Sequence, residues 1–244
     1  MGNANGKDKN AGDKELFHHQ LYLDEYLIGK HPVTVAQFQV FVKDSGYKTT
    51  AELTGGGWVY MGKAWRYVRG ANYQHPHGPE SDLYQKANHP VTQVSWEDAQ
   101  AFCIWLSRLT GHAVRLPSEA EWEKAARGTD GRIYPWGNDA PDHALLNYNM
   151  HIKDTAAVGS YPRGASQYGL LDMAGNVWEW VNDWFDKNYT QNPPQRNPKG
   201  PDFGQQRGYR GGSWSNGAGY IQPSNRSGGN PDGRFNILGF RCAR

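Results

Sequence analysis

Three segments in the first half of the chain carry apolar residues at the spacing of an amphipathic helix. The first begins after Thr34, whose hydroxyl suits the N-cap position, and Gly46 marks its end. Within it, Val35, Phe38 and Val42 fall on one face. The pattern therefore predicts a short helix between these two signals.

The other two helical segments have stronger start signals. Ser95 with Asp98 resembles a capping box, and Gly111 is a natural C-cap. Ser118 with Glu121 forms a full capping box. Their predicted buried faces consist of Ala99, Phe102, Cys103, Leu106 and Leu109 in the second helix, and Trp122, Ala125 and Ala126 in the third.

The remaining sequence has no comparable helical pattern. Residues 21–28 are typical of one or two short strands, whereas residues 48–90 are rich in turns and aromatic side chains. Short strands and turns follow residue 129, and no repeat or linker divides the chain. We expect one α+β domain over residues 1–244, with three helices in its first half, short antiparallel strands and little regular secondary structure.

Composition and charge limit the classes of function. Ten Trp and fourteen Tyr supply core area although only 37% of residues are hydrophobic, which excludes a disordered chain. The net charge of +2 is scattered, so we expect no nucleic-acid partner. No apolar run is long enough for a membrane span. No secretory signal is recognised, which leaves the compartment open and favours the cytoplasm.

Several short motifs point to a family. They occupy residues 70–79, 89–91, 94–99, 115–123, 134–137, 175–180, 210–214 and 239–242. Together, and in this order, they resemble the formylglycine-generating-enzyme (sulfatase-modifying factor) family. The resemblance implies a C-type-lectin-like fold with long irregular insertions. It also places Met1-Gly2 at the end of the family's first strand, so we expect the domain to lack most of that strand.

The same resemblance implies that the oxidase chemistry of the family is missing. Its enzymes hold copper with two cysteines shortly after Gly-Gly-Ser, and thiolates suit that soft metal. Those positions correspond here to Asn216 and to Tyr220 or Ile221. We therefore expect no copper and no formylglycine-generating activity, although Trp178 and Ser213 match positions of the family's pocket. Other branches of the family oxidise without that cysteine pair, so an oxidoreductase stays an alternative.

Two other sets of side chains have a structural and a functional interpretation. Cys103 and Cys242 can form a disulfide if the fold brings them together, but two buried thiols are the favoured interpretation. His75 and His77 flank a proline and could contribute to a mononuclear iron site. No carboxylate is obviously placed with them, so a packed structural loop is favoured.

The resemblance also implies structural calcium. One site would use the side chains of Asp172 and Glu179 with the carbonyl groups of Gly175 and Val177. The alternative is a turn in which Glu179 pairs with an arginine. A second site would lie around Asn147, Tyr148 and Asp154.

The C-terminal segment, residues 210–244, is the predicted ligand-binding region. Between family-like residues it carries short clusters of Ser, Gly, Asn, Tyr, Ile and Phe, which resemble the variable proteins of diversity-generating retroelements. Ordinary drift of a surface loop is the alternative. The predicted contacts to a protein or other macromolecular ligand, with Trp178, are Ser213, Trp214, Ser215, Asn216, Gly217, Gly219, Tyr220, Ile221, Ser227, Gly228, Gly229, Asn230, Gly233, Phe235, Asn236 and Ile237.

Three functions remain in competition. The favoured one is a non-catalytic display domain with a lectin-like scaffold. The others are an oxidoreductase of the same family and a catalytically dead paralogue that regulates an active partner. A metal-dependent turnover would favour the oxidoreductase.

Overall fold

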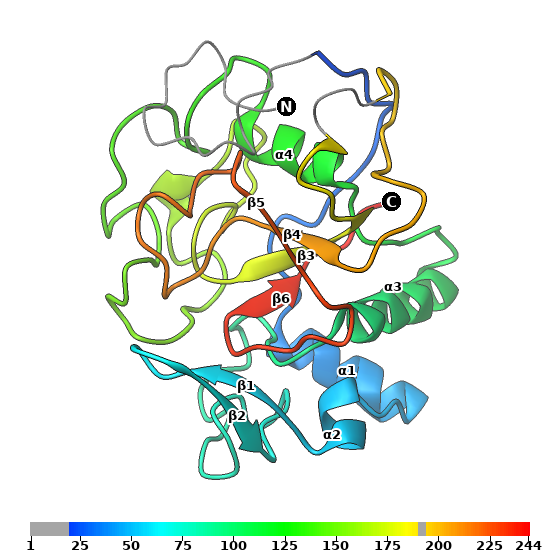
Figure 1. The fold of residues 1–244 in the computed structure, drawn as a ribbon, viewed down its shortest axis with the longest axis vertical. Coiled ribbons are helices and arrows are strands. Elements are labelled where there is room, and N and C mark those ends of the chain that lie inside the picture. Colours follow the sequence, from blue (N-terminus) through cyan, green and yellow to red (C-terminus); the bar gives the residue numbers. More distant parts are fainter. Residues whose placement is uncertain (1–19, 190–193) are drawn as a thin grey trace.

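The computed structural model describes residues 20–189 and 194–244, and Met1-Gly2 therefore lies outside the described residues. The main sheet has four strands. Figure 1 shows it crossing the middle of the molecule, with α1 and α3 near one another on one side of it. The helices are α1 (Val35–Ser45), α2 (Thr50–Thr54), α3 (Trp96–Thr110) and α4 (Glu119–Arg127), with a 3-10 turn, η3 (Pro162–Gly164).

The three predicted long helices begin and end as their caps indicate. Ser95 accepts from the backbone N–H of Asp98, and the Asp98 carboxylate accepts in return from the Ser95 N–H at 2.8 Å. The shorter aspartate therefore completes a capping box in place of glutamate. Leu109 was expected on the buried face of α3, but it is 65% exposed because it lies in the last turn, beyond the core.

The central sheet contains strands from the second half of the chain only. Its order is β5 (Arg226–Gly229), β4 (Arg207–Arg210), β3 (Trp178–Trp184) and β6 (Leu238–Phe240). β4 pairs with β5 and with β3 in antiparallel orientation, whereas β3 pairs with β6 in parallel. The C-terminal segment thus supplies two of the four strands, which fixes it to the scaffold.

The turn-rich region holds structure that the sequence did not predict. A short helix, α2, is capped by Thr49, and a hairpin follows, made of β1 (Gly56–Tyr60) and β2 (Trp65–Arg69). Conversely, residues 21–28 form no named strand. They contribute only single bridges, one from Tyr22 to Arg196 and one from Ile28 to Ala243.

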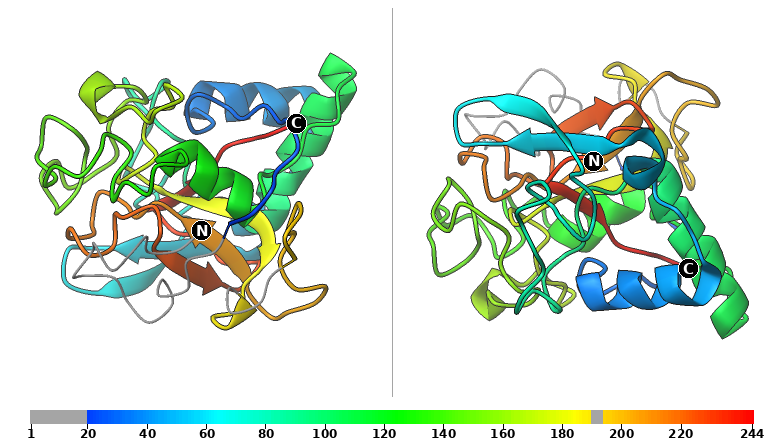
Figure 2. Two further views of the ribbon diagram at one scale, coloured as in Figure 1. Left: turned by 90° about the horizontal axis from the view of Figure 1, so that it is seen from above. Right: turned by 90° about the horizontal axis from the view of Figure 1, so that it is seen from below.

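The main core is aromatic, as the composition predicts. Phe38 of α1 packs edge-on against Phe240 of β6, with ring centroids 6.3 Å apart, and Phe102 of α3 lies 5.4 Å from the same ring. Trp180 is fully buried and donates its indole N–H to the Val94 carbonyl. These contacts join the helices to the centre of the sheet. Figure 2 shows the chain end beside α1 and α3.

No helix in the described part of the chain is long and apolar enough to cross a membrane.

Candidate functional site

The predicted ligand-binding region starts with a tight backbone turn after β4. Gly212 has a positive φ, and a Cβ on it would lie 2.8 Å from the Tyr220 carbonyl oxygen. Only glycine fits that turn without displacement. The turn buries Ser213 and Trp214, and the following residues return toward the surface.

Several predicted contact residues are in the core, which corrects the prediction of a fully displayed segment. They are buried because β3, β6 and the adjoining loops pack on them. A macromolecular ligand cannot touch these side chains in this conformation. The residues concerned are Trp178, Ser213, Trp214, Ile221, Asn236 and Ile237.

Two stretches of the segment reach the surface. In the first, residues 215–220, Tyr220 is 58% exposed, and a Cβ on Gly217 or Gly219 would meet open space. In the second, residues 227–233, Asn230 is exposed, but a Cβ on Gly228 would lie 2.5 Å from the Phe185 ring. The first stretch, named here the 215–220 loop, is therefore the freer of the two to accept other side chains.

The positions that correspond to the family's copper ligands are occupied by structural contacts. The Asn216 side-chain oxygen accepts from the Ser213 hydroxyl at 2.7 Å and from the Ser213 N–H at 3.0 Å. Ile221 is fully buried in an apolar cluster with Leu146 and Ala174. Neither side chain, nor that of Tyr220 as the other candidate for the second position, can supply a thiolate for copper.

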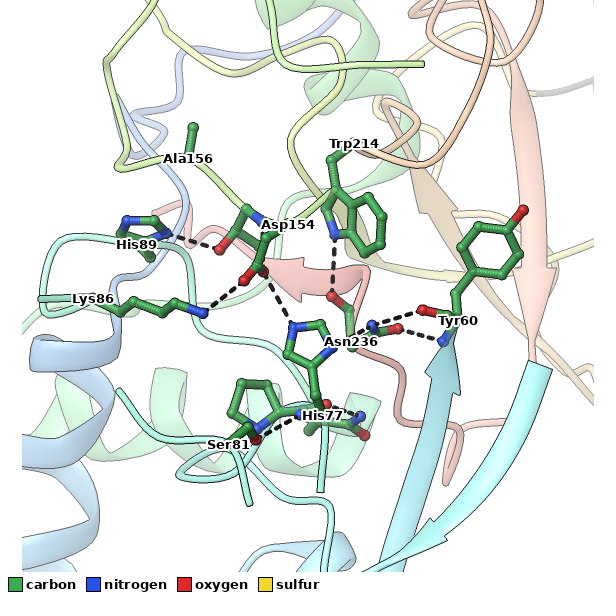
Figure 3. A network of polar contacts seen from close by, with 12 residues as sticks. Tyr60, His77, Ser81, Lys86, His89, Asp154, Ala156, Trp214 and Asn236 are labelled. Carbon is green, nitrogen blue, oxygen red and sulfur yellow. Dashed lines mark hydrogen bonds and ion pairs between the residues drawn. The ribbon is translucent and has the colours of Figure 1, made fainter. Parts of the chain in front are cut away.

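A polar network lies next to the C-terminal segment (Figure 3). His77 places Nε2 at 3.3 Å from an Asp154 carboxylate oxygen, and Lys86 Nζ lies 2.6 Å from the other oxygen. We expected no carboxylate beside the histidine pair, and that expectation was wrong. Asp154 comes from a loop distant in sequence, so spacing along the chain gave no signal for it.

The network fixes the tautomer of His77. Asn236 accepts from the Tyr60 N–H with its side-chain oxygen at 2.8 Å, so its amide nitrogen faces His77 Nδ1 at 3.2 Å. Because that nitrogen donates, Nδ1 must accept, and His77 carries its proton on Nε2 toward Asp154. His77 therefore links the loop of Asp154 to the C-terminal segment through directional hydrogen bonds.

The charge of Asp154 is held by its partners. Burial alone would raise the pKa of this carboxyl, but hydrogen bonds from His77 and Lys86 outweigh burial and lower the pKa well below its usual range. Among the described residues, no group of three or more His, Cys, Asp or Glu side chains is placed to hold a metal ion. His77, Lys86 and Asp154 are linked to one another and to Asn236 by hydrogen bonds and an ion pair.

The first predicted calcium set is arranged around an arginine. Arg241 donates to both carboxylate oxygens of Glu179, at 2.6 and 2.7 Å, and the ion pair is fully buried. Asp172 accepts from the Gly159 N–H at 2.7 Å, and burial raises the pKa of Asp172 to about 6. In this arrangement Glu179 is committed to Arg241, so the set does not fit a cation that takes six or more oxygen ligands.

The residue predicted for the second calcium site behaves differently. Asn147 is fully buried, and its side-chain oxygen has no hydrogen-bond partner among the described residues. Its amide nitrogen donates to the Asp154 carbonyl at 2.8 Å. A buried oxygen without a donor is costly unless water or a cation lies against it, so this atom fits an oxygen ligand for Ca²⁺.

The fold brings the two cysteines together. Cys103 Sγ on α3 lies 2.9 Å from Cys242 Sγ near the chain end. Burial, with Cys242 close by, raises the pKa of the Cys103 thiol well above its usual value. The Cys103 thiol therefore keeps its proton at neutral pH, which does not suit a thiolate metal site.

Comparison with known proteins decides the family. The model of the sulfatase-modifying factor enzyme 1-like domain matches residues 1–244. The chain belongs to this family. It is 38% identical to the formylglycine-generating enzyme of Streptomyces coelicolor, over 100% of this chain and 85% of that protein. It is 34% identical to the inactive Cα-formylglycine-generating enzyme 2 of Mus musculus, over 89% of this chain and 74% of that protein.

Solved structures of this sulfatase-modifying factor enzyme 1-like fold give the same architecture. PvdO from Pseudomonas aeruginosa superposes with a TM-score of 0.81 at 26% identity, over 100% of this chain and 89% of that chain. Variable protein 1 of Treponema denticola superposes with a TM-score of 0.69 at 25% identity, over 92% of this chain and 86% of that chain. The C-type-lectin-like fold expected from the sequence motifs is thereby confirmed.

Proposed function

We propose that this chain is a non-catalytic domain that binds a protein or other macromolecular ligand through the 215–220 loop. One observation carries the proposal: the positions that correspond to the family's copper thiolates, Asn216 and either Tyr220 or Ile221, carry no thiol. Asn216 is locked onto Ser213, and Ile221 fills the core, while Tyr220 between them projects outward. A rigid turn that presents an aromatic side chain among small polar residues is suited to contact a ligand.

We further propose that the loop is the diversified region of a retroelement variable protein. Gly217 and Gly219 have open space at the Cβ position, so larger residues fit there without a clash. Gly228 has none, because Phe185 packs against it. The likeness to Treponema denticola variable protein 1 supports this proposal.

The test is to sequence the coding region in related strains, together with its neighbourhood. We expect substitutions at positions 215, 217, 219 and 220, with Trp214, Ile221 and Gly228 unchanged. A nearby reverse-transcriptase gene and a near-copy of the 3′ coding segment should accompany them. Uniform loops in all strains, or variation that falls equally on buried and exposed positions, would contradict the proposal.

An oxidoreductase is the second candidate, favoured by the 38% identity to a formylglycine-generating enzyme and by the retained Trp178 and Ser213. The experiment measures copper and iron in the purified chain and O₂-dependent conversion of a cysteine-containing peptide. The matched variant Asn216→Cys/Ile221→Cys restores both thiol positions. Turnover by the wild-type chain would replace the display proposal, whereas peptide binding without turnover would favour a regulatory paralogue.

We also propose that Ca²⁺, if bound, is structural and is held at Asn147. The unpartnered side-chain oxygen of Asn147 supports this site. There Ca²⁺ would supply no chemistry to a substrate. It would join loops that no strand ladder connects.

A further inference from the structure

The β1–β2 hairpin has an open outer edge. At the two ends of the hairpin, the Met61 N–H donates to the Ala64 carbonyl and the Gly70 N–H to the Gly55 carbonyl. Between these ends, hydrogen-bonded and non-hydrogen-bonded residue pairs alternate, as in any antiparallel pair of strands. The alternation turns the peptide groups of Trp65, Tyr67 and Arg69 away from β1. In the described part of the chain no strand pairs with that side of β2.

The inner strand confirms this assignment of edges. Trp58 is a non-bonded position with respect to β2, and its N–H donates instead to the Arg234 carbonyl at 3.0 Å. Its carbonyl accepts from the Asn236 N–H at 3.2 Å. β1 is therefore covered on both edges, by β2 and by the C-terminal segment, while β2 is covered on one.

One face of the hairpin is aromatic. The cross-strand pairs Trp58–Tyr67 and Tyr60–Trp65 lie on it, with ring centroids 5.7 and 5.2 Å apart. Phe235 extends this face from the C-terminal segment and lies 5.2 Å from Trp65. Trp58, Trp65 and Tyr67 are each 40–42% exposed, so water contacts a large part of the three rings. Figure 1 shows the hairpin at the lower end of the molecule.

The charges of the hairpin have one sign. Lys63, Arg66 and Arg69 lie on it, and no carboxylate occurs between Glu52 and Glu80. Within the described residues none of the three cations has an ion-pair partner. A second copy of this chain that paired along β2 would place like charges opposite one another, which is unfavourable. A partner with carboxylates meets no such repulsion.

We propose that β2 binds an extended acidic segment of a partner protein as an added strand. The open peptide groups of Trp65, Tyr67 and Arg69 would pair with its backbone. Its apolar side chains would lie along the aromatic face, and its carboxylates, on the opposite face, would lie near Arg66. This surface is separate from the 215–220 loop, so the inference goes beyond the function proposed above.

The test uses a blocked decapeptide of alternating Glu and Val with the full chain, measured by titration calorimetry. We expect saturable binding that weakens about tenfold or more with Arg66→Glu, and that falls with added salt. Trp65→Ala should also weaken it. The control Arg108→Glu removes an exposed cation at the end of α3 and should leave the affinity within about twofold.

Other probes identify the recognised chemistry. The Lys–Val decapeptide and the Glu–Val peptide N-methylated at alternate residues should both bind at least about tenfold more weakly. Tyr220→Ala should leave peptide binding unchanged, which separates this surface from the 215–220 loop. Equal binding of the Lys–Val or N-methylated peptide overturns the proposal, as does no binding of the Glu–Val peptide at about 1 mM. Tighter binding of an oligothymidylate, or self-association that Arg66→Glu strengthens, also overturns it.

Discussion

Glu179 and Arg241 form a fully buried, two-pronged ion pair between β3 and the chain end. Arg241 also donates to the carbonyls of Gly29, Lys30 and Leu171, so its guanidinium contacts three separate segments of the chain. A charge pair out of contact with water is stabilising only while both partners are present. This pair therefore determines how the C-terminal strand is held against the sheet.

Arg241→Ala should lower the free energy of unfolding by about 3–5 kcal/mol, because it leaves the Glu179 carboxylate buried without its ion-pair partner. Urea unfolding followed by tryptophan fluorescence measures the change. The control Arg196→Ala removes the exposed pair with Asp24 and should cost at most about 1 kcal/mol. A similar decrease in the free energy of unfolding in both variants would show that the buried pair contributes no more to stability than the exposed pair.

Stability should also fall as pH rises toward 8, because of Asp183. Burial, and secondarily the charge of Glu119, raise the pKa of this carboxyl from 3.8 to about 8. The unfolded group loses its proton near pH 4, whereas the folded group keeps it to about pH 8. Folding therefore takes up a proton in this window, and each pH unit removes up to about 1.4 kcal/mol of stability.

Asp183→Asn is the matched variant, because its amide oxygen can still accept from the Glu119 N–H. The variant should flatten the pH dependence, so that its stability relative to the wild-type chain increases from pH 5 to pH 8. Urea unfolding at several pH values measures the difference. Parallel curves for the two proteins would refute the prediction.

The sequence predicted the parts of this fold that local rules control. The capping signals at Thr34, Ser95 and Ser118 place three helices correctly, since a cap and an apolar face are both local. The hairpin at Trp58 and Trp65 was missed. Aromatic residues there recur at every second position, as in a strand, but the many glycines and prolines of residues 48–90 favoured turns.

The site was predicted less well, because its contacts join residues that are far apart in the sequence. Ile221 and Asn236 were predicted to contact a ligand, yet contacts with segments far away in sequence bury them. The meeting of His77 with Asp154 also depends on the folded loops and leaves no motif. Fold class follows from periodicity and motifs, whereas exposure of single loop residues does not.

Oxidation should join Cys103 to Cys242, whose sulfur atoms are neighbours in the fold. Treatment with a mild oxidant should reduce the number of titratable thiols from two to none without dimer formation. The link encloses most of the chain, so it should raise the free energy of unfolding by about 2–4 kcal/mol. Cys103→Ser should lose this gain, and a gain that persists in Cys103→Ser would show that the disulfide is not its cause.

Calcium should stabilise the chain through Asn147 if the proposed site is correct. The buried side-chain oxygen of this residue has no donor, so a bound cation removes an unfavourable interaction as well as adding a link between loops. Ca²⁺ at about 100 times its dissociation constant should raise the free energy of unfolding by about 2.7 kcal/mol, and Asn147→Ala should abolish the effect. Asp172→Asn tests the first predicted calcium set, in which Glu179 is already bound by Arg241. If calcium acts through the Asp172 set, that variant and not Asn147→Ala will lose the response, and the Glu179–Arg241 pair must then rearrange to admit the ion.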